Sequence, residues 1–159
     1  MSREEDPMTI ISNSTVIRCT PEEAFDYLSD HRSELEWNPG IESIEKLTDG
    51  PVGLGTKYLA KWKSAPQPVE VETVRYDRPH GWTVHSGGLT EVTVTIRLEP
   101  VAQGTRLHSD FDARPHGWFR LVFPLFLAKI RKEESANMTY LREALERRAT
   151  RSSDWEGTH

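Results

Sequence analysis

Three residues with metal-binding chemistry stand at alternate positions of one expected strand: His108, Asp110 and Asp112. Alternate strand residues share a face, and imidazole and carboxylate groups are ligands for divalent metals. His116 follows a few residues later in a turn. The residues on the opposite face of the same strand are apolar (Leu107, Phe111 and Ala113). We therefore expect the His/Asp face to meet water, and we predict no metal site.

Three polar residues of an expected C-terminal helix offer proton-transfer chemistry: Glu133, Glu134 and Asn137 lie on or beside its apolar stripe. Burial raises the pKa of a carboxylate, which then serves as a general acid or base near neutral pH. The alternative is that each carboxylate reaches the helix edge or pairs with an arginine. Both alternatives stay open, and no catalytic residue is assigned.

Other nucleophilic or polar side chains are expected inside the domain. Cys19 lies on an inward strand position and is expected to act as a small apolar residue, since neither a histidine nor a helix N-terminus activates it. Ser86 and Ser109 also fall on inward strand positions, where they can bond to a ligand or to the backbone. We find no phosphate loop, nucleophile elbow or dinucleotide fingerprint, and we predict no cofactor.

Bulk properties narrow the class of protein. The 159 residues suit one domain, and the formal net charge of −5 with a pI near 5.7 argues against a nucleic-acid partner and an electrostatic membrane anchor. The most apolar run, 118–130, is broken by Arg120, Pro124 and Lys129 and is too short to span a bilayer, so no stable membrane insertion is expected. A single cysteine fits a reducing compartment, and we predict a cytoplasmic protein. The oligomeric state is left open.

Two helix starts are visible in the first third of the chain. Thr20 and Glu23 have capping-box spacing, with a proline at the first helical position. Ser33 and Glu36 repeat that spacing, which predicts a second short helix at 34–37.

Seven segments are predicted to be strands, at about 8–19, 41–47, 55–63, 68–77, 82–86, 91–99 and 105–112. In 91–99, four apolar residues alternate with polar ones, as in an antiparallel sheet covered on one side. In 68–77 the apolar phase slips, which predicts a bulge near 72–73 that bends the sheet.

A long helix is predicted over 124–149, and Pro124 either starts or kinks it. One stripe at helical spacing carries its inward residues: Phe119, Phe123, Phe126, Ile130, Asn137, Leu141 and Leu145. At 1.5 Å per residue such a helix is about 39 Å long, enough to cross a seven-stranded sheet.

This order of elements predicts an α+β domain in which a curved antiparallel sheet and the long helix bury each other's apolar faces. A bent sheet around a helix leaves space that is either a ligand cavity or filled core. The candidate cavity residues are Trp37, Tyr58, Trp62, Val71, Trp82, Val84, Ser86, Val94, Ile96, Ser109, Phe111, Phe123, Phe126, Ile130 and Asn137. Residues 50–55 and 114–118, rich in Gly and Pro, are the expected entrance.

Several short motifs resemble the START-like, or SRPBCC, superfamily, in particular its polyketide cyclase/dehydrase-type branch. The motifs are Ile17-Arg18-Cys19-Thr20-Pro21-Glu22-Glu23-Ala24-Phe25, Trp37-Asn38-Pro39-Gly40-Ile41, Gly53-Leu54-Gly55-Thr56, Tyr76-Asp77-Arg78-Pro79 and Gly104-Thr105-Arg106-Leu107. Their order and spacing cover residues 8 to 149 and are specific for the fold rather than for an activity.

The resemblance implies the helix-grip fold, with two short helices, one long C-terminal helix and a cavity between sheet and helix. The resemblance covers a ligand-binding domain over 8–149. From their composition, residues 1–7 are expected to be a disordered leader and residues 150–159 a polar tail that frays. We expect the protein to bind or carry a small apolar molecule, such as a lipid, polyketide, sterol or quinone. The alternatives are an enzyme that cyclises or dehydrates such a molecule, and an interaction domain whose cavity is filled.

Overall fold

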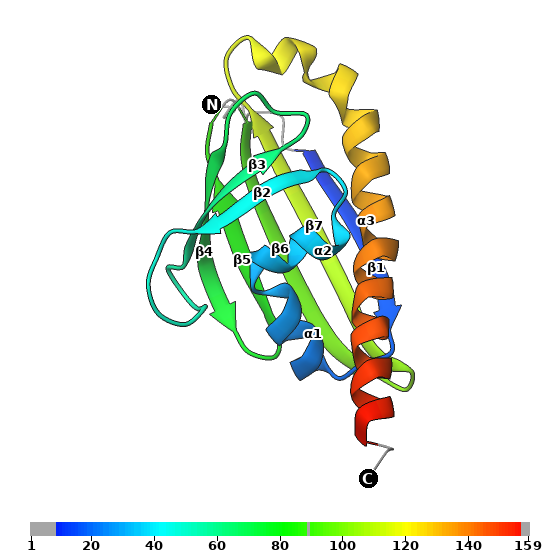
Figure 1. Ribbon diagram of the computed structural model, residues 1–159. Helices are drawn as coiled ribbons and strands as arrows, with labels where there is room; N and C mark the ends of the chain where they lie inside the picture. The colour runs from blue at the N-terminus through cyan, green and yellow to red at the C-terminus, as the bar shows by residue number, and fades with distance from the viewer. Residues whose placement is uncertain (1–8, 89, 157–159) are drawn as a thin grey trace, which may run out of the picture.

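A seven-stranded antiparallel sheet forms the body of the protein and carries the helices on its concave side (Figure 1). The computed structural model describes residues 9–88 and 90–156. The strands are β1 (Thr9–Ile17), β2 (Ile41–Lys46), β3 (Lys57–Trp62), β4 (Val69–Asp77), β5 (Gly81–Ser86), β6 (Thr90–Val101) and β7 (Gly104–Pro115), in the order β1-β7-β6-β5-β4-β3-β2. The predicted helix-grip arrangement is thereby confirmed, whereas the predicted leader at 1–7 lies outside the described residues.

The first helix begins as its capping residues predict. In α1 (Pro21–Leu28) the Thr20 hydroxyl accepts a hydrogen bond from the backbone N–H of Glu23 at 3.1 Å. A 3-10 turn, η1 (His31–Ser33), then leads into α2 (Glu34–Trp37). The predicted Ser33 cap is wrong, because the 3-10 turn gives Ser33 helical backbone angles, and a capping residue needs an extended backbone.

The register places one set of strand residues on the concave face. Trp82 on β5 is paired with Ile96 on β6, which is paired with Ser109 on β7. The predicted bulge is present in β4 between Thr73 and Arg75, one to two positions later than expected. It keeps Thr73 on the inner face and turns Val74 outward, so the sheet bends where β4 meets β5.

Gly104 makes the tight approach between the start of β7 and the end of β1. Its φ is +141°, and a Cβ atom there would lie 2.2 Å from the carbonyl oxygen of Ile17. Only glycine fits this conformation and this distance, so the β6–β7 turn needs it.

The last helix, α3 (Phe119–Glu156), is longer than predicted at both ends. Pro124 lies inside it and neither starts nor ends it. The polar tail predicted to fray from residue 150 is helical as far as Glu156, because nothing in it breaks a helix; residues 157–159 lie outside the described part. Among the described residues, no helix is both long enough and apolar enough to cross a membrane.

The contacts of α3 are concentrated at one side of the sheet. Its main partner is β1, with fewer contacts to β7 and to α2 (Figure 1). Its buried residues are Phe123, Asn137, Met138, Leu141, Ala144 and Leu145. The predicted helix is long enough to cross the whole sheet, but α3 does not do so, and α1 and α2 lie over the concave face instead (Figure 1). The sequence predicted these two short helices without showing what they cover.

The core is tightest beneath α1. Phe25 is fully buried and meets Tyr76 and Trp82 edge-on, with ring centroids 5.0 and 5.2 Å apart. Ile17 and Leu107 are fully buried beside them. This end of the domain is filled by side chains.

Candidate functional site

The sheet brings the predicted cavity residues of β3 to β7 together on its concave face. Eight of the predicted residues are buried: Tyr58, Val71, Trp82, Val84, Ile96, Ser109, Phe123 and Asn137. Six are partly buried: Trp37, Trp62, Ser86, Val94, Phe111 and Ile130. The prediction of Phe126 as a residue facing the sheet does not fit its 46 % exposure. It stacks instead on Phe119, with centroids 5.8 Å apart, because α3 lies beside the sheet rather than across it.

Cover on the concave face is uneven along each strand. On β6, Ile96 is buried but Val94, two residues earlier, is partly exposed. On β5, Trp82 and Val84 are buried but Ser86 is partly exposed. Since all of these side chains point inward, the face is open to solvent at the end near Ser86 and closed beneath α1.

Across the interior of the domain, from Trp82 beneath α1 to Tyr58 on β3, several buried polar atoms lack a hydrogen-bond partner among the described residues. We call them the interior polar row: His31 Nε2, Ser33 Oγ, Trp37 Nε1, Tyr58 Oη, Thr73 Oγ1 and Trp82 Nε1. Buried polar atoms are nearly always paired, so a group of six that lacks partners needs an explanation. They come from η1, α2, β3, β4 and β5, and a bound molecule or water within the domain would satisfy them.

Tyr58 belongs to this row and is fully buried. Its ring meets His31 edge-on at 5.5 Å, and burial, with the nearby Asp30 carboxylate, raises the pKa of its hydroxyl to about 12. The backbone N–H of His31 lies near the Tyr58 hydroxyl oxygen and partly offsets the rise in its pKa. The contact does not have the geometry of a hydrogen bond. Tyr58 is thus a neutral hydroxyl at physiological pH.

A carboxylate from α3 stands at the edge of the same region. Burial, together with the negative charges of Glu34 and Glu133, raises the pKa of Glu134 to about 7. Glu34 is held in place by His31 Nδ1 at 3.0 Å and by the Asn38 side-chain amide, which donates to it at 3.1 Å. Two carboxylates from α2 and α3 therefore share one site, and Glu134 is the one that exchanges a proton near neutral pH.

Four of these residues were not predicted to belong to the site: His31, Ser33, Glu34 and Thr73. The capping pattern predicted a helix at 34–37 but gave no sign that it would meet α3 about a hundred residues later in the chain. Thr73 was missed because the apolar pattern of β4 changes phase there, and the pattern favoured Val74 as the next inward residue. The two alternatives for Glu133 and Glu134 apply to different residues in the structure. Glu133 is exposed and pairs with Lys129 at 3.7 Å, whereas Glu134 has the raised pKa.

The predicted His/Asp stripe lies on the outer face of β7. His108 approaches Glu99 at 3.3 Å, Asp110 accepts from the Ser12 hydroxyl at 2.7 Å, and Asp112 lies 3.8 Å from Arg114. These side chains are engaged with neighbours on the sheet surface. In the described part of the chain, no group of three His, Cys, Asp or Glu residues is arranged to hold a metal ion.

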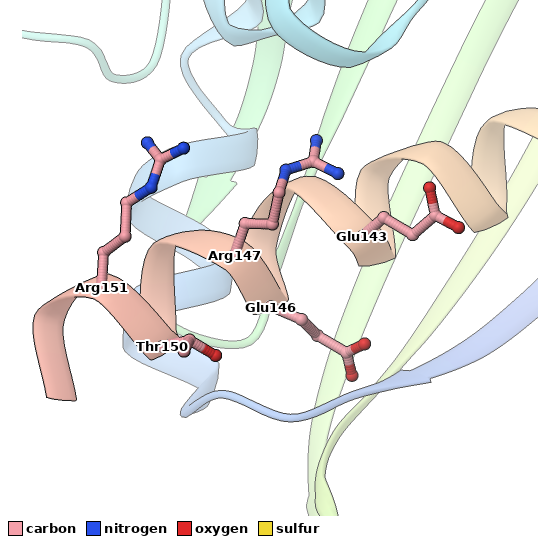
Figure 2. Close-up of a pocket in the computed structure, with 5 residues that line it drawn as sticks. All are labelled: Glu143, Glu146, Arg147, Thr150 and Arg151. Carbon is pink, nitrogen blue, oxygen red and sulfur yellow. The ribbon is translucent and has the colours of Figure 1, made fainter. Parts of the chain in front are cut away.

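Two surface depressions lie away from the concave face. One, of about 450 Å³, is near the C-terminal end of α3 (Figure 2). There Glu146 also accepts a hydrogen bond from the Arg18 backbone N–H. Its lining is polar or charged: Glu143, Glu146, Arg147, Thr150 and Arg151. The other, of about 250 Å³, lies on the outer sheet face beside His85 and Glu91. The residues that line both are of polar or charged types, whereas sites for largely apolar ligands are lined mainly by hydrophobic and aromatic side chains.

Comparison with known families and structures is consistent with this fold. The sequence profile described as "Polyketide cyclase / dehydrase and lipid transport" matches residues 8–151. Comparison with curated protein sequences gives no significant match.

Solved structures with the same fold include bacterial and plant proteins. A protein from Thermus thermophilus, TTHA0849, is 18% identical, with a TM-score of 0.69 over 91% of this chain and 99% of that one. The Zhui aromatase/cyclase from Streptomyces sp. R1128 is 14% identical, with a TM-score of 0.70 over 90% and 96%. Norcoclaurine synthase from Thalictrum flavum, solved as a point mutant with a transition-state analogue, is 16% identical, with a TM-score of 0.61 over 89% and 99%. At these identities the likeness is one of fold.

Proposed function

Because the chain belongs to the polyketide cyclase/dehydrase and lipid transport family, we propose that it binds a small, largely apolar molecule against the concave face of its sheet. The observation that carries this proposal is the interior polar row, six buried polar atoms that lack partners among the described residues. Two of the side chains that carry them, Trp82 and Trp37, pack in or against the apolar core. A buried polar atom without a hydrogen bond destabilises the folded protein. A ligand that forms hydrogen bonds with these atoms removes that penalty, and the free energy recovered contributes to its affinity.

The row also restricts the chemistry of the ligand. The indole nitrogens of Trp37 and Trp82 only donate hydrogen bonds, so they require an acceptor. The hydroxyl groups of Tyr58 and Thr73 both donate and accept. A molecule with an apolar body and a carbonyl or hydroxyl oxygen fits this set, whereas a pure hydrocarbon leaves the donors unpaired.

Thermal denaturation with two probes tests the proposal. Emodin combines a flat apolar body with carbonyl and hydroxyl oxygens, and palmitate carries an acyl chain. We expect emodin to raise the melting temperature by mass action and to quench tryptophan fluorescence. Native mass spectrometry of the freshly purified protein tests for a molecule bound in the cell. Absence of a co-purified molecule, together with no effect of either probe, would contradict the proposal.

A second candidate function, acid–base catalysis on the bound molecule, is favoured by Glu134. A carboxylate with a pKa of about 7 takes a proton from a carbon next to a ketone more readily than an ordinary carboxylate does. In a dehydration it gives that proton to the hydroxyl on the neighbouring carbon, which leaves as water while the carbon–carbon double bond forms. Glu34, held by His31, keeps the site negative and the proton affinity of Glu134 high.

Deuterium exchange into acetylacetone in heavy water separates binding from catalysis. If Glu134 acts as a base, the protein accelerates exchange at the carbon between the carbonyls, and Glu134→Gln removes the effect. The matched control is Glu133→Gln, whose side chain is exposed and paired with Lys129. Equal rates for the protein and buffer alone would leave the binding function without catalysis.

A further inference from the structure

The start of α3 and the turn before it carry a charge opposite to the rest of the chain. Residues 114–132 contain five Lys or Arg and no Asp or Glu. The other 140 residues contain 15 Lys or Arg and 25 Asp or Glu. The segment therefore has a charge of +5 within a chain whose net charge is −5, and this local excess is hidden in the total.

The same segment exposes large apolar side chains. Leu121 is 84 % exposed and Leu125 is 79 % exposed, and Trp118 is 65 % exposed in the turn before them. In a helix, positions 121 and 125 share a face with Lys129 and Lys132, which are also exposed. We call Trp118, Leu121, Leu125, Lys129 and Lys132 the docking face.

The docking face lies where α3 stands away from the sheet. In Figure 1 the first turns of α3 extend from the end of β7 beyond the strands, before the helix turns to run beside β1. The aromatic residues on the other side of these turns pack on one another: Phe119 lies 6.0 Å from Phe123 and stacks on Phe126. The leucines are thus held outward by an inner aromatic cluster.

We propose that the docking face binds reversibly to the surface of an anionic lipid bilayer. Leucine and tryptophan side chains enter the boundary between headgroups and acyl chains, and the lysines one to two turns later meet the lipid phosphates. The negative charge of the remaining surface is repelled by the same bilayer, so the protein binds in one orientation. This interaction is peripheral, and it does not depend on the identity of a ligand in the domain.

Charge selects the bilayer over a second copy of the chain. A two-fold symmetric contact would place one docking face on another and bring two segments of charge +5 together. Like charges in contact are destabilising, and the neighbouring Glu133, which pairs with Lys129 at 3.7 Å, lowers the charge of the segment only from +5 to +4. An anionic lipid surface supplies the apolar layer and the negative charge in one partner.

Vesicle co-sedimentation tests the proposal. At physiological salt we expect the protein to pellet with vesicles of equal parts phosphatidylcholine and phosphatidylglycerol, and to remain in solution with phosphatidylcholine alone. Binding should weaken as salt is raised, because the lysines act through screened charge. No sedimentation with the anionic vesicles would overturn the proposal.

Paired variants identify the surface responsible. Leu121→Ser with Leu125→Ser should weaken binding about tenfold or more through lost apolar burial, and Lys129→Gln with Lys132→Gln about fivefold per lysine. The matched controls are Leu54→Ser, at a leucine 72 % exposed elsewhere, and Lys57→Gln with Lys63→Gln; these should bind like the unaltered protein. The proposal would be overturned if the double leucine variant bound the vesicles as well as the unaltered protein does. It would also be overturned if the unaltered protein formed a concentration-dependent dimer that this variant alone abolished.

Discussion

His31 Nδ1 lies 3.0 Å from Glu34 Oε1, and this contact joins the 3-10 turn to the first residue of α2. It fixes the Glu34 carboxylate on the side of α2 that faces α3, where its charge raises the proton affinity of Glu134. The same histidine ring covers the edge of Tyr58. The short turn that carries His31 thus connects the carboxylates Glu34 and Glu134 to the interior polar row. The predictions below test Glu134 of the carboxylate pair and Thr73 of the row.

Glu134 should make the stability of the protein fall as pH rises. Its folded-state pKa of about 7 exceeds the ordinary value of 4.5, so the folded protein holds this proton more tightly than the unfolded chain. The stabilisation is complete below about pH 4.5 and is lost as pH rises through 7. At about 1.4 kcal/mol per pKa unit, the loss should be on the order of 3 kcal/mol.

Urea denaturation at about pH 5 and about pH 8, on either side of the folded-state pKa, measures this effect. Relative to the unaltered protein, Glu134→Gln should be more stable at the higher pH than at the lower one, because its amide does not ionise. Glu133→Gln, at an exposed neighbour, should show no such change. If the free energy of unfolding changed equally with pH in all three proteins, the group responsible would not be Glu134.

Two buried threonines should respond oppositely to the same substitution. Thr73 is 1 % exposed and its hydroxyl has no partner among the described residues, whereas Thr105 is fully buried and donates to the Cys19 carbonyl at 2.8 Å. Thr73→Val should leave the ligand-free protein equally stable or more stable, and Thr105→Val should cost about 1–2 kcal/mol.

The same pair tests the ligand site. Emodin should bind several-fold more weakly to Thr73→Val, while Thr105→Val, although less stable, should keep its affinity. A stability loss in Thr73→Val as large as that in Thr105→Val would show that its hydroxyl is satisfied within the ligand-free domain.

Phe123 and Phe126 should differ in the cost of truncation to alanine. Phe123 is 5 % exposed, so its loss should cost about 3–5 kcal/mol by leaving a void. Phe126 is 46 % exposed, and its loss should cost about 1–2 kcal/mol, since nearly half of the ring is already outside the core. Free energies of unfolding from urea titrations measure both; equal large losses would mean that Phe126 is packed core.

Cys19 should be nearly inert in the folded protein. Burial raises the pKa of its thiol to about 12, and Glu23 and Glu146 contribute to the rise. The thiolate fraction is then about a thousandfold lower than that of an ordinary thiol. Labelling with Ellman's reagent should be slow in buffer and rapid in urea, and rapid stoichiometric labelling of the native protein would contradict this.

Much of the fold was readable from local patterns. The alternation of Val92, Val94, Ile96 and Leu98 with polar residues predicted a sheet covered on one side, and all four lie on its concave face. Thr20 and Glu23 predicted the start of α1 correctly. These features depend on neighbours within a few residues, and backbone geometry is set at that range.

The position of the long helix was decided by tertiary packing. Phe119, Phe123 and Phe126 have the spacing of one buried stripe, yet Phe126 is exposed because α3 packs beside β1 while α1 and α2 cover the centre of the sheet. Periodicity tells which residues share a face of a helix. It does not tell how far that face lies from its partner or what lies between them.

The candidate site depends even more on the folded structure. Tyr58, Trp82 and Asn137 were predictable as inward residues, but the approach of Glu34 to Glu134 joins segments about a hundred residues apart. The raised pKa of Glu134 follows first from burial and then from the charge of Glu34, and both arise only when α2 and α3 pack together. The sequence by itself determined the elements and which residues share a face of each. The tertiary structure decided which polar groups of the described residues are buried together without a hydrogen-bond partner.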